Sequence, residues 1–144
     1  MPTETQIATT EILLLEKVPS DVAVIQEAIQ NNNLNVVTEC PEIVQFLRHK
    51  GEYQHAPRPD LILLDLDLSI TEDCEVLTEI KKDSQFKRIP VVVIASSGRY
   101  EDVFQAYDLH ANAYITKPAD RKELVKILRA TLHFWLSLVR LPKQ

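Results

Sequence analysis

The fold is decided by the stretch Leu61-Ile62-Leu63-Leu64-Asp65-Leu66-Asp67-Leu68. Four successive apolar residues are typical of a strand that is buried on both faces, as in a parallel sheet. Parallel sheets bind their ligands at the carboxyl ends of the strands, and Asp65 stands at such an end. A carboxylate there is costly to bury unless a cation, a proton or a phosphoryl-transfer role accounts for it. The sequence therefore predicts a functional site at Asp65.

Strands and helices alternate along the rest of the chain. Further apolar runs predict strands at 12–15, 34–39, 90–94 and 113–116. Capping chemistry predicts helix starts at Pro19-Ser20-Asp21, Asp73 and Asp120. Five strands interleaved with five helices predict an α/β fold, namely a flavodoxin-like, doubly wound, five-stranded parallel sheet of order 2-1-3-4-5 with helices on both faces. In that order strands 1 and 3 are neighbours, so we expect Glu16 and Lys17 beside Asp65.

Length and composition are those of one globular domain. The chain of 144 residues is long enough for a sizeable core, so we expect a single domain over 1–144, with its core at about 10–137 and a C-terminal extension at 138–144. The net charge of −5 argues against a nucleic-acid partner. Without a membrane span or signal-peptide features, we expect a cytoplasmic protein that does not contact membranes. Cys40 and Cys74 match no metal spacing and are expected to be reduced thiols.

Several short motifs, in their order and spacing, resemble the receiver domain of two-component response regulators over essentially the whole chain. They are Ile12-Leu13-Leu14-Leu15-Glu16, Asp65, Pro90-Val91-Val92-Val93-Ile94, Tyr114 and Lys117-Pro118. The resemblance is closest to the small single-domain regulators that are paired with cyanobacterial phytochromes. The segments that resemble this subgroup are Gly51-Glu52-Tyr53, Pro57-Arg58-Pro59-Asp60, Phe134-Trp135-Leu136 and Leu141-Pro142.

The resemblance implies a signalling protein rather than an enzyme, which accepts a phosphoryl group from a histidine kinase on Asp65. It implies that Lys117 contacts Asp65 and then the phosphoryl group, and that Tyr114 is a switch residue. It also implies a Mg²⁺ site formed by Glu16, Asp65 and Asp67, with Asp67 contributing its carbonyl oxygen. The implied partners are a histidine kinase, with a phytochrome as one candidate, and an unidentified downstream protein.

Among the departures from the family pattern, those at Lys17 and Ala95 bear most directly on the chemistry of the site. Lys17 stands where receivers carry a second acidic residue that binds the metal directly, so we expect Mg²⁺ binding to be weak or absent. One unit-charge interaction at ~4 Å and an effective dielectric constant of about 20 is worth about 4 kcal/mol, which can exceed what a modest Mg²⁺ site offers. Alternatively, the ammonium of Lys17 occupies the metal position as a built-in counter-charge. Ala95 replaces the Ser or Thr that couples phosphorylation to Tyr114, and Ser96 is a doubtful substitute because successive strand residues point to opposite faces.

Two other functions remain open at this stage. One is a pseudo-receiver that acts as a protein-interaction adaptor without phosphorylation, which Lys17 and Ala95 favour. The other is a phosphatase of the haloacid-dehalogenase type, because the stretch 61–69 resembles the opening motif of that family. The position of the stretch near mid-chain and the lack of a later paired acidic motif disfavour the phosphatase.

The last predicted helix is more apolar than one buried face requires. Packing against a sheet needs only positions such as 124, 128, 132 and 135. Val125, Leu136 and Val139 would then form a second apolar stripe. Self-complementary apolar patches most often close as two-fold dimers, so we expect a homodimer through the last helix. The alternative is that the end of the chain folds back over the stripe.

Overall fold

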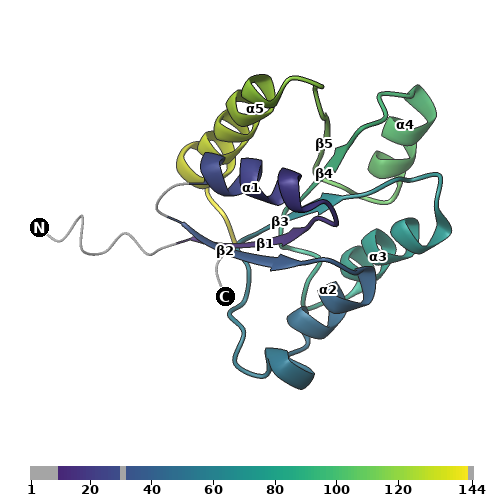
Figure 1. Ribbon diagram of the computed structural model, residues 1–144. Helices are drawn as coiled ribbons and strands as arrows, with labels where there is room; N and C mark the ends of the chain where they lie inside the picture. The colour runs from purple at the N-terminus through teal and green to yellow at the C-terminus, as the bar shows by residue number, and fades with distance from the viewer. Residues whose placement is uncertain (1–9, 30–31, 143–144) are drawn as a thin grey trace, which may run out of the picture.

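The computed structural model describes residues 10–29 and 32–142, and in them five strands alternate with five α-helices (Figure 1). The strands and α-helices are β1 Glu11–Leu15, α1 Pro19–Ala28, β2 Asn33–Val37, α2 Cys40–Leu47, β3 Leu61–Asp65, α3 Thr71–Lys82, β4 Val91–Ala95, α4 Tyr100–Asp108, β5 Ala113–Thr116 and α5 Arg121–His133. All neighbouring strands pair in parallel, in the order β2-β1-β3-β4-β5. The predicted flavodoxin-like topology is therefore confirmed.

The sheet separates two hydrophobic cores, because successive strand residues point to opposite faces. Leu13, Ile62 and Val93 belong to the core under α2, α3 and α4. Leu14 and Leu63, each one residue further along a strand, belong to the core under α1 and α5. Burial on both faces explains why β1, β3 and β4 read as continuous apolar runs.

Two of the three predicted helix caps are wrong. Helix α1 begins at Pro19, after Val18, and α3 begins at Thr71, after Ile70; neither preceding residue caps its helix with a side chain. Proline at a first helical position starts a helix without a polar cap, because its fixed φ suits the helix. Asp21 and Asp73 consequently lie inside the first turns, where their carboxylates are free to contact other elements. Asp120 is the cap of α5, as predicted, and accepts a hydrogen bond from the backbone of Lys122 at 2.9 Å.

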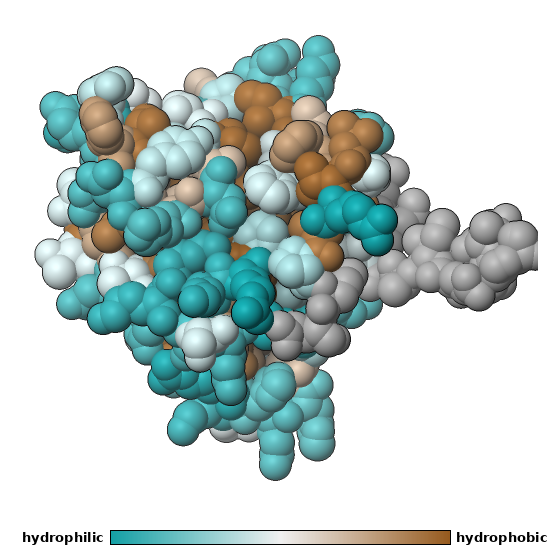
Figure 2. All heavy atoms as spheres, turned by 180° about the vertical axis from the view of Figure 1, so that it is seen from behind, coloured by the Kyte–Doolittle hydropathy of each residue, from teal (hydrophilic) through white to brown (hydrophobic). Residues whose placement is uncertain are grey.

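The last helix buries more of its surface than its sequence suggested. Val125, predicted to lie on a second apolar stripe, is only 8% exposed, because α5 packs against α1 as well as the sheet. Leu136, also assigned to that stripe, packs against the same core. It belongs to a π-helical turn, η3 Phe134–Leu138, that follows α5. The exposed residues are instead Phe134 and Leu138, at 47% and 64%. Seen from behind, hydrophobic side chains gather over this end of the molecule (Figure 2).

The two ends of the predicted domain need separate comment. Residues 1–9 and 143–144 lie outside the described residues, so the predicted extension 138–144 is described only as far as residue 142. Among the described helices, none combines the length and the apolar character that crossing a membrane requires.

Candidate functional site

A cavity of about 420 Å³ lies at the carboxyl edge of the sheet. Its walls come from the segments that follow β1, β3, β4 and β5, which is where the sequence placed the site. Eleven of its lining residues are polar or charged: Glu16, Lys17, Asp21, Asp65, Asp67, Asp73, Ser96, Ser97, Asp102, Tyr114 and Lys117. Six of these residues carry carboxyl groups and two carry ammonium groups, so the cavity is predominantly acidic.

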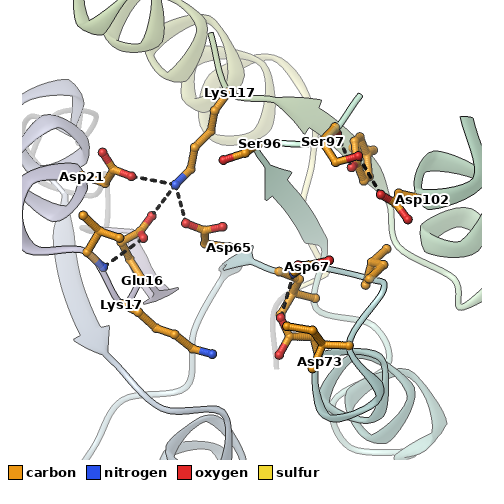
Figure 3. A pocket seen from close by; sticks show the side chains of 15 residues that line it. Glu16, Lys17, Asp21, Asp65, Asp67, Asp73, Ser96, Ser97, Asp102 and Lys117 are labelled. Carbon is orange, nitrogen blue, oxygen red and sulfur yellow. Dashed lines mark hydrogen bonds and ion pairs between the residues drawn. The ribbon is translucent and has the colours of Figure 1, made fainter. Parts of the chain in front are cut away.

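The ammonium of Lys117 lies at the centre of three carboxylates (Figure 3). Its Nζ lies 3.0 Å from Glu16 Oε1 and 2.9 Å from Asp21 Oδ2, and it also pairs with Asp65 Oδ2. Glu16 extends β1, Asp65 ends β3, and Lys117 follows β5, so parallel pairing brings their ends to one edge. Asp21 reaches the same point from the first turn of α1.

Burial sets the electrostatics of this group. Desolvation, followed by contact with the neighbouring Asp65, raises the pKa of Glu16 from 4.5 to about 7. Burial alone would lower the pKa of Lys117, but hydrogen bonds to Asp65 and Asp21 outweigh it and hold that pKa above its usual value. Near neutral pH Lys117 is therefore fully charged, whereas Glu16 is close to half-protonated.

Lys17 does not reach this group. Its side chain is exposed and lies apart from Lys117 and the three carboxylates (Figure 3). Within the part of the chain that the structure describes, Lys17 forms no ion pair, and its charge is felt instead by the thiol of Cys40. The ammonium that offsets the pocket carboxylates is thus that of Lys117. The alternative that Lys17 serves as the built-in counter-charge is therefore wrong.

Asp67 is placed at the rim of the pocket rather than among the three carboxylates. Its Oδ1 accepts hydrogen bonds from the backbone and hydroxyl of Ser69, at 3.0 and 2.6 Å, and these bonds lower its pKa. Its backbone N–H donates to Oδ2 of the buried Asp73 at 2.7 Å. Asp73 thereby fixes the loop after β3, on which the Asp67 carbonyl lies.

The switch positions also have definite places. Ala95 is the last residue of β4 and is buried, whereas Ser96 is exposed and lines the pocket with its side chain near Lys117 (Figure 3). The hydroxyl of Tyr114 donates to the carbonyl oxygen of Ser97 at 2.6 Å. Tyr114 is thus tied to the loop that follows β4 by a backbone contact, without a side-chain hydroxyl at position 95.

The sequence and the structure of this chain match those of known proteins closely. The family model of the response regulator receiver domain matches residues 12–129. The chain belongs to this family. Response regulator Rcp1 of Synechocystis sp. (strain ATCC 27184 / PCC 6803 / Kazusa) is 40% identical over 135 residues, which cover 91% of this chain and 92% of Rcp1.

Two solved receiver structures superpose on almost the whole chain. The phosphorylated cyanobacterial phytochrome response regulator RcpA matches with a TM-score of 0.88 at 45% identity, over 94% of this chain and 100% of RcpA. The Mn²⁺-bound form of Rcp1 matches with a TM-score of 0.84 at 40% identity, over 93% of this chain and 99% of Rcp1. The protein is therefore a response regulator of the two-component type with phytochrome-associated relatives, and the predicted resemblance is confirmed. Membership of this family also accounts for the Asp65-Leu66-Asp67 motif. The resemblance of the stretch 61–69 to a phosphatase motif is therefore not needed to explain it.

Receiver domains bind Mg²⁺ or Mn²⁺ in an acidic site, and the donors present here suit such an ion. Oxygen atoms of Glu16, Asp21 and Asp65 all lie within 4.8 Å of one another. Carboxylate oxygens are the ligands that hard divalent cations prefer. Lys117 contacts all three, so a metal ion and this ammonium would draw on the same oxygens.

Sequence reasoning missed four polar residues of the receiver pocket. Asp21 and Asp73 were interpreted as helix caps. The feature that could have predicted their place in the pocket is an aspartate in the first turn of a helix that begins at the ligand-binding edge of the sheet. Ser97 and Asp102 were not singled out at all. The hydroxyl of Ser97 donates to Oδ2 of the buried Asp102 at 2.6 Å, which braces the loop between β4 and α4. No local sequence pattern predicts this pair, because its role depends on a hydrogen bond that forms only in the folded protein.

Proposed function

We propose that this receiver accepts a phosphoryl group on Asp65 from a histidine kinase and passes the signal on by protein contact. The observation that carries the proposal is the ion pair of Asp65 with Lys117 at the mouth of a carboxylate-lined cavity. The ammonium of Lys117 pairs with the Asp65 carboxylate, which would be the nucleophile, and the same ammonium is available to the phosphoryl oxygens. On this account the protein acts as a signalling component rather than as an enzyme.

The transfer step follows from the groups present. One carboxylate oxygen of Asp65 forms a bond to the phosphorus of the phosphohistidine, and the phosphorus–nitrogen bond of the kinase breaks. The imidazole leaves with the electron pair of that bond and takes up a proton. Lys117 would stabilise the charge on the phosphoryl oxygens, and the Ser96 hydroxyl, which lines the same cavity, would donate to one of them.

We further propose that Mg²⁺ binds more weakly than in a receiver with two acidic residues after β1. Glu16, Asp21, Asp65 and the carbonyl of Asp67 would hold the ion, which when bound would offset the charge of the transferred group. Lys17 supplies no ligand oxygen at its position. Lys117 already engages all three carboxylates, so binding has to displace or share these contacts. The expected weakness therefore has two causes, one of which was not visible in the sequence.

We also propose that phosphorylation of Asp65 changes the conformation of Tyr114 and the surrounding surface only weakly. Ala95 offers no hydroxyl to follow the phosphoryl group, and the Tyr114 hydroxyl is already engaged by the Ser97 carbonyl. A pseudo-receiver that works by protein contact alone stays the second candidate, and the missing hydroxyl and the missing acid at Lys17 favour it. The two candidates differ in whether Asp65 is ever modified.

The partners are proposed from the family and from the exposed surface. The kinase is a histidine kinase, with a phytochrome as one candidate, since RcpA is a phytochrome response regulator. The downstream partner is a protein, and the cytoplasm is the expected location. A homodimer would bury Phe134 and Leu138 at the end of the last helix, in place of the stripe that included Val125.

The direct test is intact-mass analysis after incubation with a small phosphodonor and magnesium. The proposal predicts the mass of one added phosphoryl group, which is absent from Asp65→Asn. Glu72→Gln, an exposed neighbour on α3, is the matched control and should be modified like the wild type. A wild-type protein that stays unmodified under conditions that modify an ordinary receiver would favour the pseudo-receiver.

A further inference from the structure

Three hydrogen bonds meet at Ser97, in the loop between β4 and α4. Its hydroxyl donates to Oδ2 of Asp102 at 2.6 Å (Figure 3) and accepts from the backbone N–H of Arg99 at 3.1 Å. Its carbonyl oxygen accepts from the hydroxyl of Tyr114 at 2.6 Å. One loop residue thus connects β5, which carries Tyr114, to the first turn of α4, which carries Asp102.

Asp102 lines the Asp65 cavity, yet no step of the phosphoryl transfer uses it. Its side chain is buried, and within residues 10–29 and 32–142 it forms no ion pair. A buried carboxylate without a cation is costly unless hydrogen bonds stabilise its charge. The first turn of a helix favours a negative charge, and the Ser97 hydroxyl supplies a short hydrogen bond to it. This hydroxyl is therefore firmly engaged by Asp102.

We infer that Asp102 is a positioning residue, which acts through Ser97 to hold Tyr114 in place without a phosphoryl group on Asp65. The bond to Asp102 fixes the Ser97 side chain against α4, and it thereby fixes the Ser97 carbonyl oxygen that accepts from Tyr114. Because residue 95 is alanine, no side-chain hydroxyl at that position links Asp65 to this loop. The place of Tyr114 is then set by the loop between β4 and α4, in the unmodified protein.

These contacts exist without modification of Asp65, so the inference does not depend on phosphoryl transfer. It can fail in a protein that is phosphorylated, and it can hold in a pseudo-receiver. The competing explanation is that core packing alone places Tyr114, since its ring also packs against the core under α2, α3 and α4. Ser97 and Asp102 would then stabilise the loop without any effect on Tyr114.

The test is NMR of the full chain with ¹³C-labelled tyrosine rings, without phosphodonor or Mg²⁺. The signals of Tyr114 are assigned by their loss in Tyr114→Phe, and Tyr53, which bonds to Glu42 at 2.9 Å, is the reference for an intact fold. Ser97→Ala and Asp102→Ala should shift the ring signals of Tyr114 and leave those of Tyr53 in place. Ser97→Thr keeps the hydroxyl and should give the wild-type signals.

A second readout is the titration of the Tyr114 hydroxyl, followed through the same ring signals. Burial raises the pKa of Tyr114 above its ordinary value of 10.0, and the negative charges of Asp102 and Asp67 raise it further. Asp102→Asn keeps an oxygen for the Ser97 hydroxyl but removes the charge, so the pKa of Tyr114 should fall. Asp108→Asn removes one charge from the exposed end of the same helix and should leave that pKa unchanged.

Several results would overturn the inference. Ring signals of Tyr114 that stay at their wild-type positions in both Ser97→Ala and Asp102→Ala would assign its place to core packing alone. Signals that move as far in Ser97→Thr as in Ser97→Ala would show that the hydroxyl is not the group that matters. If the alanine variants also move the signals of Tyr53, the fold itself is affected and Asp102→Asn decides. A pKa of Tyr114 that does not fall in Asp102→Asn then rejects the contact.

Discussion

Replacing Glu16 by glutamine is the perturbation for which the structure gives the clearest magnitude. Glu16 is fully buried beside Asp65, and its pKa rises from 4.5 to about 7. One pKa unit corresponds to about 1.4 kcal/mol, so ionised Glu16 lowers the free energy of unfolding by up to about 3 kcal/mol. Glutamine keeps the shape and an oxygen for Lys117 but carries no charge. We therefore expect Glu16→Gln to be more stable than the wild type above pH 7, by up to about 3 kcal/mol.

The sign of the pH dependence follows from the raised pKa. Below pH 4.5 Glu16 is protonated in both the folded and the unfolded chain, so its contribution is fully retained. Between pH 4.5 and about 7 the unfolded chain loses this proton first, and the wild type loses stability as the pH rises. Glu16→Gln lacks this component, so the stabilities of the two proteins should converge near pH 4.5 and diverge towards pH 8.

Urea unfolding at a series of pH values measures this difference. The fluorescence of Trp135, the single tryptophan of the chain, reports the transition. Glu27→Gln, an exposed substitution on α1, is the control and should leave the pH dependence of wild-type stability unchanged. If Glu16→Gln follows the wild type in parallel from pH 4.5 to 8, Glu16 is not the buried acid that the geometry implies.

Three further predictions concern the metal, the switch and assembly. Lys17→Asp should tighten Mn²⁺ binding, measured as free ion by electron paramagnetic resonance, by about tenfold or more, because position 17 lines the same cavity and the change replaces a cation there by a carboxylate. Asp21→Asn should weaken that binding, and equal affinities among all three proteins would remove both residues from the metal site. Ala95→Thr should increase the response of Tyr114 to beryllofluoride, followed by tyrosine-ring NMR; a wild type that already responds fully would contradict this. Light scattering at micromolar concentration should give a dimer mass for the wild type and a monomer mass after truncation following Trp135, whereas a wild-type monomer would reject the dimer.

The fold could be predicted from the sequence because its central strands are recognisable as apolar runs. Leu61–Asp65 and Val91–Ala95 are buried on both faces and therefore read as unbroken apolar runs. Their alternation with helical patterns leaves few parallel topologies, and the observed order is one of them. The pairing of Asp65 with Lys117 was expected from the resemblance to receiver domains, and it is compatible with this topology because parallel strand ends meet at one edge of the sheet.

The side-chain contacts within the site could not be predicted from the sequence, because they depend on where the ends of long side chains lie in the folded protein. Lys17 follows Glu16 directly, but its side chain is exposed and ends away from the three carboxylates, so the ammonium among them is that of Lys117. Asp21 looks like a capping residue in one dimension, yet the turn of α1 directs it towards Lys117. Val125 likewise needed the packing of α5 against α1, which no pattern within α5 reveals.

The central claim is that Asp65 is a phosphoacceptor held ready by Lys117. It is tested most directly by the time course of phosphorylation in wild type, Asp65→Asn and Lys117→Gln, with a small phosphodonor and magnesium and with intact mass as the readout. The account predicts one phosphoryl group on the wild type, none on Asp65→Asn, and slower modification of Lys117→Gln. A wild-type protein that remains unmodified, or a phosphoryl group that persists in Asp65→Asn, would contradict it.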